Sequence, residues 1–262
     1  MAMAERISGS EEAFVKKMNE KAKQLGLKNT NFVTSTGLDA DNHYSSAYDM
    51  SLIARELVKY DKILEFTGTY EDYLRANTSS PFWLVNTNRL VRFYEGVDGL
   101  KTGYTSNAGY CLTTTAKKDG MRLITVVMNE PDTSKRSADT TKMLNYGFNV
   151  YMIRNIIDEN TVIDNVKVDL GKKLTADIVS KETITILNKK SDEKRNITYE
   201  ANIDKIVAPI KKGDIVGTIN IIEDGKIIST VDATIPEDIE KANIFIIFVR
   251  NLKELLSGSL IF

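Results

Sequence analysis

The segment that decides the fold is Gly96–Thr105, which reads GVDGLKTGYT. Its first glycines predict a tight turn, and the residues that follow Lys101-Thr102-Gly103 have the pattern of a β-strand. A phosphate-binding P-loop is excluded on spacing, because that motif needs glycine directly before its lysine and Leu100 stands there. Lys-Thr-Gly alone is a weak signal that also suits a solvated turn, so its meaning depends on the surrounding sequence.

Residues 1 to about 150 alternate between helical and strand-like patterns. Ser8 and Glu11 match a capping box that predicts a first helix, and Gly26 is placed to end it. Ser46 predicts the start of a second helix. The spacing of apolar residues predicts a third helix over about 137–151. Together with intervening strands, these helices indicate a mixed unit of helices and strands.

Strand patterns lie between the second and third helices at four places: Phe82–Val85, Leu90–Phe93, Gly109–Thr115 and Met121–Met128. The last two flank Lys118-Asp119-Gly120, whose residues favour a hairpin turn. Beyond Ile157, short β-branched runs separated by polar turns replace the helices: Thr161–Val168, Thr183–Leu187, Asn196–Tyr199, Ile215–Ile222 and Lys226–Ala233. This spacing predicts a small all-β domain over residues 156–240.

The C-terminal segment, residues 241–262, differs again because Ile244–Val249 is an uninterrupted run of six apolar residues. The run is far shorter than the roughly 20 residues that span a bilayer. It predicts that Ala242–Phe262 binds a membrane surface as an amphipathic helix, with Arg250 and Lys253 extending toward the headgroups. A helix or strand that packs on the protein itself is an equally good interpretation.

The composition excludes several classes of function. The chain has 262 residues, of which 42% are hydrophobic and 27% charged, which suits a folded core under an ordinary aqueous surface. Its 35 basic and 36 acidic residues give a net charge of -1, so no basic field predicts nucleic-acid binding. A single cysteine, Cys111, cannot form an internal disulfide, and a single histidine, His43, is a poor metal site. The composition therefore predicts no metal site at His43.

Several further segments surround the Lys-Thr-Gly stretch in a fixed order: Leu25–Phe32, Gly37–Asp39, His43–Met50, Val85–Leu90, Ala108–Tyr110 and Leu144–Phe148. In this order they resemble the serine D-Ala-D-Ala carboxypeptidases, the family of low-molecular-weight penicillin-binding proteins, and the resemblance covers nearly the whole chain. It implies an α+β fold. Residues 1–155 would be the C-terminal portion of the carboxypeptidase domain, 156–240 an all-β domain, and 241–262 an amphipathic anchor helix.

The resemblance also implies a site that uses neither a metal nor an organic cofactor. The family acts by acylation of a Ser-x-x-Lys serine, helped by a Ser-x-Asn motif, while Lys-Thr-Gly holds the substrate. It implies that Lys101, Thr102 and Gly103 bind substrate and that the N–H of Tyr104 forms half of an oxyanion hole. Arg136 aligns with an arginine that holds the substrate carboxylate region, although a surface charge at a helix start fits the residue equally well.

The two catalytic motifs are missing from these 262 residues. The one Ser-x-x-Lys, Ser191–Lys194, follows Lys-Thr-Gly instead of preceding it and lies in a charged run that predicts a solvated loop. Residues 1–7 lack the features of a secretory signal and resemble the helix that follows Ser-x-Asn in the family. We therefore predict no catalytic nucleophile in this chain, and no carboxypeptidase turnover by it alone.

By resemblance, the function is removal of the terminal D-alanine from peptidoglycan stem pentapeptides during cell-wall synthesis. The implied partners are the pentapeptide, β-lactams in the complete enzyme, and a membrane surface, with an extracytoplasmic, peripherally membrane-associated location. Two alternatives remain open: a β-lactamase-like hydrolase, against which the β domain and the anchor count, and a non-catalytic, membrane-tethered module that binds peptidoglycan.

Overall fold

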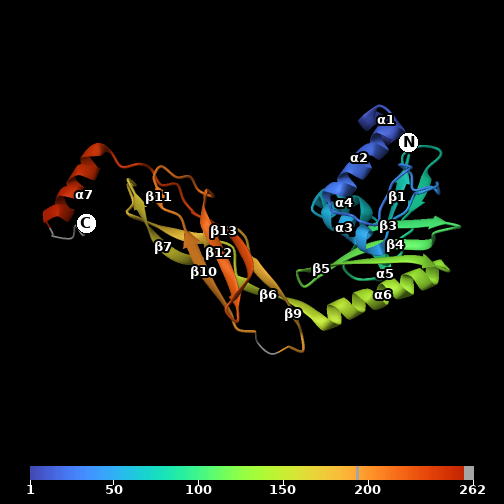
Figure 1. Ribbon diagram of the computed structural model, residues 1–262. Helices are drawn as coiled ribbons and strands as arrows, with labels where there is room; N and C mark the ends of the chain where they lie inside the picture. The colour runs from blue at the N-terminus through green and yellow to red at the C-terminus, as the bar shows by residue number, and fades with distance from the viewer. Residues whose placement is uncertain (193–194, 257–262) are drawn as a thin grey trace. The chain divides into compact units, whose positions relative to one another are not determined.

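The computed structural model describes residues 1–192 and 195–256, which form an α+β fold as predicted (Figure 1). The chain separates into two compact units, Met1–Met152 and Ile153–Phe262. The division into domains at residues 155/156 and 240/241 stays a prediction. Each unit has its own hydrophobic core, so each is described by itself.

The first unit is built on a three-stranded antiparallel sheet with the order β3-β4-β5. Its strands are β3 (Val97–Thr105), β4 (Gly109–Lys118) and β5 (Met121–Glu130), and a separate hairpin pairs β1 (Glu71–Leu74) with β2 (Phe82–Val85). The helices are α1 (Ala2–Ser8), α2 (Glu11–Gln24), α3 (Ala47–Leu57), α4 (Asp61–Thr67), α5 (Leu90–Phe93) and α6 (Thr133–Val150). The core joins this sheet to α6 through Leu112, Val127 and Leu144.

The predicted turn between β4 and β5 is confirmed. Lys118 pairs with Met121, so the loop consists of Asp119 and Gly120, and both have positive φ, 48° and 76°. Two positive φ values are what a type I′ turn requires, and glycine and aspartate tolerate them best. The second helix is confirmed as well, because Ser46 caps α3 by accepting a hydrogen bond from the Asp49 amide.

Three local predictions are wrong. Ser10, not Ser8, caps α2, because α1 extends to Ser8 and Gly9 ends it at φ 83°. Leu90–Phe93 is the helix α5 and not a strand; the Asn88 side chain accepts a hydrogen bond from the Leu90 amide at the start of this turn. Helix α6 starts at Thr133, ahead of the predicted 137, because Asp132 caps it.

The second unit is mostly β structure, as predicted. A six-stranded sheet has the order β10-β12-β13-β8-β7-β11, and β6 pairs with β9. The strands are β6 (Tyr151–Ile157), β7 (Val162–Asp169), β8 (Thr175–Ser180), β9 (Ile184–Lys189), β10 (Ile197–Ile203), β11 (Ile206–Val207), β12 (Ile215–Glu223) and β13 (Lys226–Thr234). All five predicted runs are strands. The pattern missed β8 because two of its buried positions hold the small residues Ala176 and Ser180.

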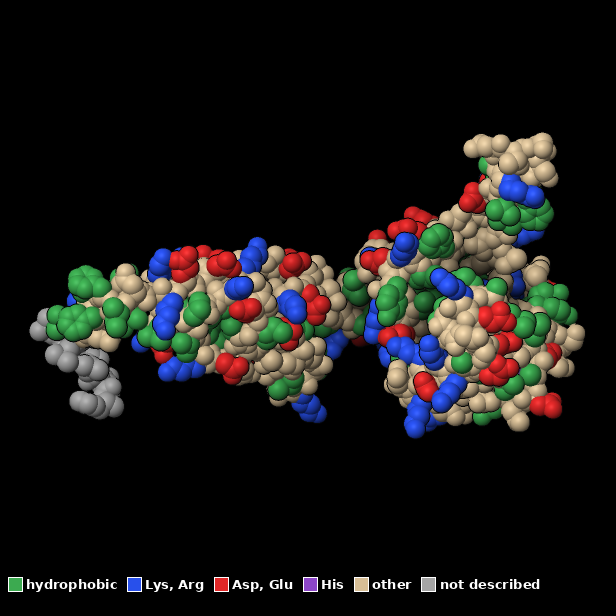
Figure 2. Space-filling model, turned by 90° about the horizontal axis from the view of Figure 1, so that it is seen from above, with side chains coloured by type: hydrophobic (Ala, Val, Ile, Leu, Met, Phe, Trp, Pro, Cys, Tyr) green, Lys and Arg blue, Asp and Glu red, His purple; other side chains and the backbone are tan. Residues whose placement is uncertain are grey.

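The chain continues from the second unit into α7 (Ile244–Leu256), whose first turn is capped by the Asn243 side chain. Figure 2 shows hydrophobic side chains gathered at this end of the second unit. Arg250 donates hydrogen bonds to the carbonyl oxygens of Gly171 and Lys172, both at 2.6 Å, so the prediction that it extends toward headgroups is wrong. Leu260, Ile261 and Phe262, which belong to the predicted anchor, lie outside the described residues. Among the helices of the described part, none is long and apolar enough to cross a bilayer.

Candidate substrate-binding site

All five residues singled out by the sequence line one cavity of the first unit. The cavity has a volume of about 1340 Å³, and its walls come from α3, β3, β4, β5, α6 and the segment that joins β2 to α5. Lys101, Thr102, Gly103 and Tyr104 enter it from β3, and Arg136 enters it from α6. Residues from two separate elements therefore share one cleft large enough for a peptide end.

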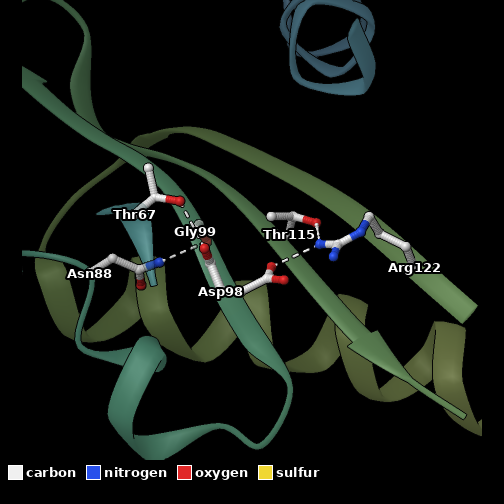
Figure 3. A network of polar contacts seen from close by, with 6 residues as sticks. All are labelled: Thr67, Asn88, Asp98, Gly99, Thr115 and Arg122. Carbon is white, nitrogen blue, oxygen red and sulfur yellow. Dashed lines mark hydrogen bonds and ion pairs between the residues drawn. The ribbon is translucent and has the colours of Figure 1, made fainter. Parts of the chain in front are cut away.

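The start of β3 is held in place by hydrogen bonds to its backbone (Figure 3). The Asn88 amide group donates to the Gly99 carbonyl at 3.0 Å, and the Thr67 hydroxyl donates to the Asp98 carbonyl at 2.8 Å. A Cβ on Gly99 would lie 2.6 Å from the Thr67 hydroxyl oxygen, so only glycine leaves room for this contact. These contacts fix the backbone directly before Lys101.

A second set of contacts ties the side chain of Asp98 to the middle of the sheet. Arg122 forms a 2.8 Å ion pair with Asp98 and donates to the Thr115 hydroxyl, also at 2.8 Å. Figure 3 shows that the three side chains span β3, β4 and β5. Both charged partners are only partly exposed, so the pair is screened less than a surface ion pair. The strand that carries Lys-Thr-Gly is thus supported from both sides.

Within Lys-Thr-Gly, the lysine and the threonine have different surroundings. Lys101 is exposed, and its ammonium donates to the carbonyl of Thr102. The Thr102 hydroxyl lies 2.7 Å from the Thr87 hydroxyl, either of which can be the donor. A hydroxyl pair of this kind leaves one proton free to be donated to a bound carboxylate. The cleft therefore combines a cation with a hydroxyl donor along β3.

Arg136 is buried, with only 6% of its surface exposed, so the alternative of a surface charge is wrong. One terminal nitrogen donates to the Thr87 carbonyl at 3.2 Å, while its Nε has no hydrogen-bond partner in the described part of the chain. Burial lowers the pKa of this guanidinium below its usual value. Within residues 1–192 and 195–256 no carboxylate forms an ion pair with it. A buried cation without a counter-charge is the arrangement that an anionic ligand would complete.

Thr87 is a residue of the candidate site that the sequence did not single out. It contacts Thr102 through its hydroxyl and Arg136 through its carbonyl, so it connects the two halves of the site. The available signal was its position in Asn86-Thr87-Asn88, a polar triplet that directly follows an apolar strand. Both flanking asparagines hydrogen-bond to backbone groups, which holds Thr87 at the cleft.

The remaining candidates have structural roles. His43 accepts hydrogen bonds from the amides of Val33 and Thr34, at 3.0 and 3.2 Å, and so shapes a loop. Buried Asp49 accepts from the Asn29 amide, at 2.7 Å, and does the same for its loop. The described residues contain no group of three or more potential metal ligands. The ring of Tyr104 stacks beside that of Tyr110 with 4.4 Å between centroids, which leaves its backbone N–H as its candidate contribution.

A fixed strand with Lys-Thr-Gly, lining a cleft beside a buried arginine, is consistent with the class of serine enzymes that recognise penicillin. Comparison with known families agrees. Residues 1–133 match the model described as D-alanyl-D-alanine carboxypeptidase, and residues 151–241 match the penicillin-binding protein 5 C-terminal domain. The chain belongs to the D-alanyl-D-alanine carboxypeptidase family.

Individual relatives agree with this family assignment. The chain is 51% identical to D-alanyl-D-alanine carboxypeptidase DacF of Bacillus subtilis over 95% of its own length and 64% of the relative's. It resembles the crystal structure of penicillin-binding protein 5 from Haemophilus influenzae, with a TM-score of 0.66 and 31% identity, over 92% of this chain and 70% of that one. Penicillin-binding protein D2 from Listeria monocytogenes in its cefotaxime-bound form matches at 36% identity and a TM-score of 0.50, over 55% of this chain and 58% of that chain. The chain thus spans 64% of the length of this curated relative, which is less than two thirds.

Proposed function

We propose that the protein is a serine-type carboxypeptidase that removes the terminal D-alanine from peptidoglycan stem pentapeptides, and that these 262 residues contribute substrate binding. Family membership supports the reaction, and the buried Arg136 beside Thr102 supports the binding role. Such a reaction needs an activated serine. The sequence contains one Ser-x-x-Lys, in the second unit; Ser191 contacts Asp192 there, and Lys194 lies outside the described residues.

In this proposal the terminal carboxylate of the peptide binds between β3 and α6. The Lys101 ammonium exchanges its bond to the Thr102 carbonyl for a bond to the carboxylate, and the Thr102 hydroxyl donates a second. Arg136 supplies a positive potential that attracts the carboxylate and stays hydrogen-bonded to the Thr87 carbonyl. The N–H of Tyr104 would stabilise the oxyanion that forms at the attacked carbonyl. Gly103 lets the peptide backbone run beside the strand, since it has no side chain.

The test compares a diacetyl-L-Lys-D-Ala-D-Ala ligand with its C-terminal amide in an NMR titration of the chain. Charge-assisted hydrogen bonds to the carboxylate should make the acid bind at least about tenfold more tightly than the amide. Arg136→Gln and Lys101→Ala should each reduce this preference. Lys142→Gln is the matched control, because it removes an exposed cation from the same helix. Equal binding of acid and amide by the unchanged chain would refute the carboxylate role.

β-lactams belong to the proposed ligands of the complete enzyme, supported by the cefotaxime-bound relative. The proposal also places the protein outside the cytoplasmic membrane, with α7 lying on the membrane surface. The support is one apolar helix face: Ile244, Phe245 and Phe248 are 86%, 72% and 62% exposed. Each such side chain contributes about 1.5–3 kcal/mol when it is fully buried, so a few of them suffice for peripheral binding.

A further inference from the structure

The β1–β2 hairpin beside the cleft is exposed along its whole length. All eight strand residues are exposed, and six of them are large and apolar: Tyr73, Leu74, Phe82, Trp83, Leu84 and Val85. A two-stranded hairpin buries little by itself, and an exposed apolar patch of this kind is typical of a surface that contacts another group. The hairpin therefore has the character of a binding surface.

The two faces of the hairpin differ in their chemistry. Tyr73 pairs with Trp83 and Glu71 with Val85, so these four side chains share one face. The Trp83 indole N–H donates to the Glu71 carboxylate at 3.2 Å, which fixes the ring and places a carboxylate at its edge. The opposite face carries Phe82, Leu84, Leu74 and Asp72, and no indole–carboxylate hydrogen bond is found there among the described residues.

The Trp83 face continues directly into the cleft. Val85 lies two residues beyond Trp83 on the same face and lines the cleft. The base of the hairpin is anchored there, because the Asn86 amide donates to the Tyr70 carbonyl at 2.7 Å. From Trp83 to Thr87 an extended chain covers roughly 13 Å. A stem pentapeptide covers roughly 17 Å when extended, so a group at its far end can reach the hairpin while its terminus occupies the cleft.

The chemistry of this face favours a sugar over other occupants. A pyranose ring has apolar C–H faces that stack on an aromatic ring, and hydroxyl or amide groups at its edge that donate to a carboxylate. Glu71 supplies that acceptor. Arg92, 3.9 Å from Glu71 and above the Tyr70 ring at 5.1 Å, adds donors for a carbonyl oxygen.

We infer that Trp83 and Tyr73 form a binding platform for an N-acetylhexosamine ring of the peptidoglycan glycan strand, adjacent to the cleft for the stem peptide. The inference rests on the proposed function, because the sugar is expected at the far end of the same substrate. The platform binds a neutral sugar and takes no part in bond cleavage. It would favour peptides that are still attached to glycan over free peptides.

Trp83 is the single tryptophan of the chain, so intrinsic fluorescence reports directly on the platform. Titration with the β-1,4-linked N-acetylglucosamine trimer should produce a saturable change in emission. Tyr73→Ala should weaken binding by about fivefold, the loss of one aromatic stacking contact. Phe82→Ala is the matched control for Tyr73→Ala, since Phe82 and Tyr73 are about equally exposed, at 55% and 53%, but lie on opposite faces. It should leave the dissociation constant within about twofold.

Three results would overturn the platform. They are an unchanged emission spectrum with the trimer, an equal response to maltotriose, and self-association of the chain that Tyr73→Ala abolishes without any saccharide effect. The diacetyl-L-Lys-D-Ala-D-Ala titration separates this inference from the proposed function. If that peptide binds with its carboxylate preference while the trimer does not, the platform is wrong and the function stands. Tyr73→Ala should leave the peptide's dissociation constant unchanged.

Discussion

Replacing Arg136 with glutamine should weaken binding of a peptide carboxylate more than it changes the free energy of unfolding. The arginine contributes one hydrogen bond to the fold, at 3.2 Å to the Thr87 carbonyl, and a hydrogen bond of a charged group contributes about 1.5–3 kcal/mol. Against this, its Nε is unpaired and its charge is buried without a counter-ion, which costs about 1–3 kcal/mol.

The two terms nearly cancel, so the net change in unfolding free energy should stay within about 1.5 kcal/mol, or roughly 3–6 °C in Tm. Loss of the charge removes a contact of about 1.5–3 kcal/mol to the carboxylate, which weakens peptide binding by roughly 10–150-fold. Thermal unfolding and the NMR titration with diacetyl-L-Lys-D-Ala-D-Ala measure the two quantities on the same sample.

Arg122→Gln gives the contrasting case. Arg122 is paired with Asp98 and donates to Thr115, so its loss leaves a partly buried carboxylate unpaired and should lower stability by about 1–3 kcal/mol. The reasoning about Arg136 would be refuted if Arg136→Gln lowered the unfolding free energy by more than about 3 kcal/mol while peptide binding stayed the same. Arg136 would then be an ordinary structural arginine.

Three further outcomes are expected. Hydrogen bonds from Lys59 and Lys21 lower the pKa of Glu56 from 4.5 to about 2. The stabilisation from these bonds should therefore be complete above pH 4.5 and be lost as the pH falls toward 2. The unfolding free energies of the chain and of Glu56→Gln, measured in urea, should converge over that range. A polypeptide of these 262 residues should not be labelled covalently by a fluorescent penicillin, and an adduct that survives denaturation would contradict this. The chain should sediment with anionic liposomes in a salt-resistant manner, whereas a version ending at Lys241 should not; equal partitioning would mean that α7 packs on protein.

The sequence predicted the components of the cleft better than the contacts between them. Lys101 through Tyr104 form a contiguous motif, and Arg136 follows from the family resemblance, so all five could be named without coordinates. Thr87 could not, because its contacts with Thr102 and Arg136 span 15 and 49 residues and depend on how the intervening chain folds. Local periodicity contains no information on such pairings.

Errors in the predicted fold arose where two short local patterns in the sequence compete. Leu90–Phe93 is apolar enough for a strand, but the Asn88 side chain stabilises a helical turn that only tertiary structure selects. At the N-terminus two serines lie close together, and the choice between Ser8 and Ser10 depends on where the preceding helix ends. The long amphipathic helices and the hairpin at Asp119-Gly120 have no such competitor, and the sequence predicted them, although the starts of α2 and α6 were misplaced.

The contact of Arg250 with the Gly171 and Lys172 carbonyls affects how the second unit would respond to a surface bound by α7. Ala242 donates its amide to the Leu170 carbonyl at 2.8 Å, and Arg250 fastens the helix two turns further on, so α7 is attached at two points. A helix attached at one point can rotate relative to the unit that carries it, whereas a helix attached at two points keeps a fixed orientation to that unit. A surface that captured the exposed face of α7 would therefore set the tilt of the β domain as well as its height. Because both acceptors are backbone atoms, substitutions in the 170–172 loop would leave this coupling in place.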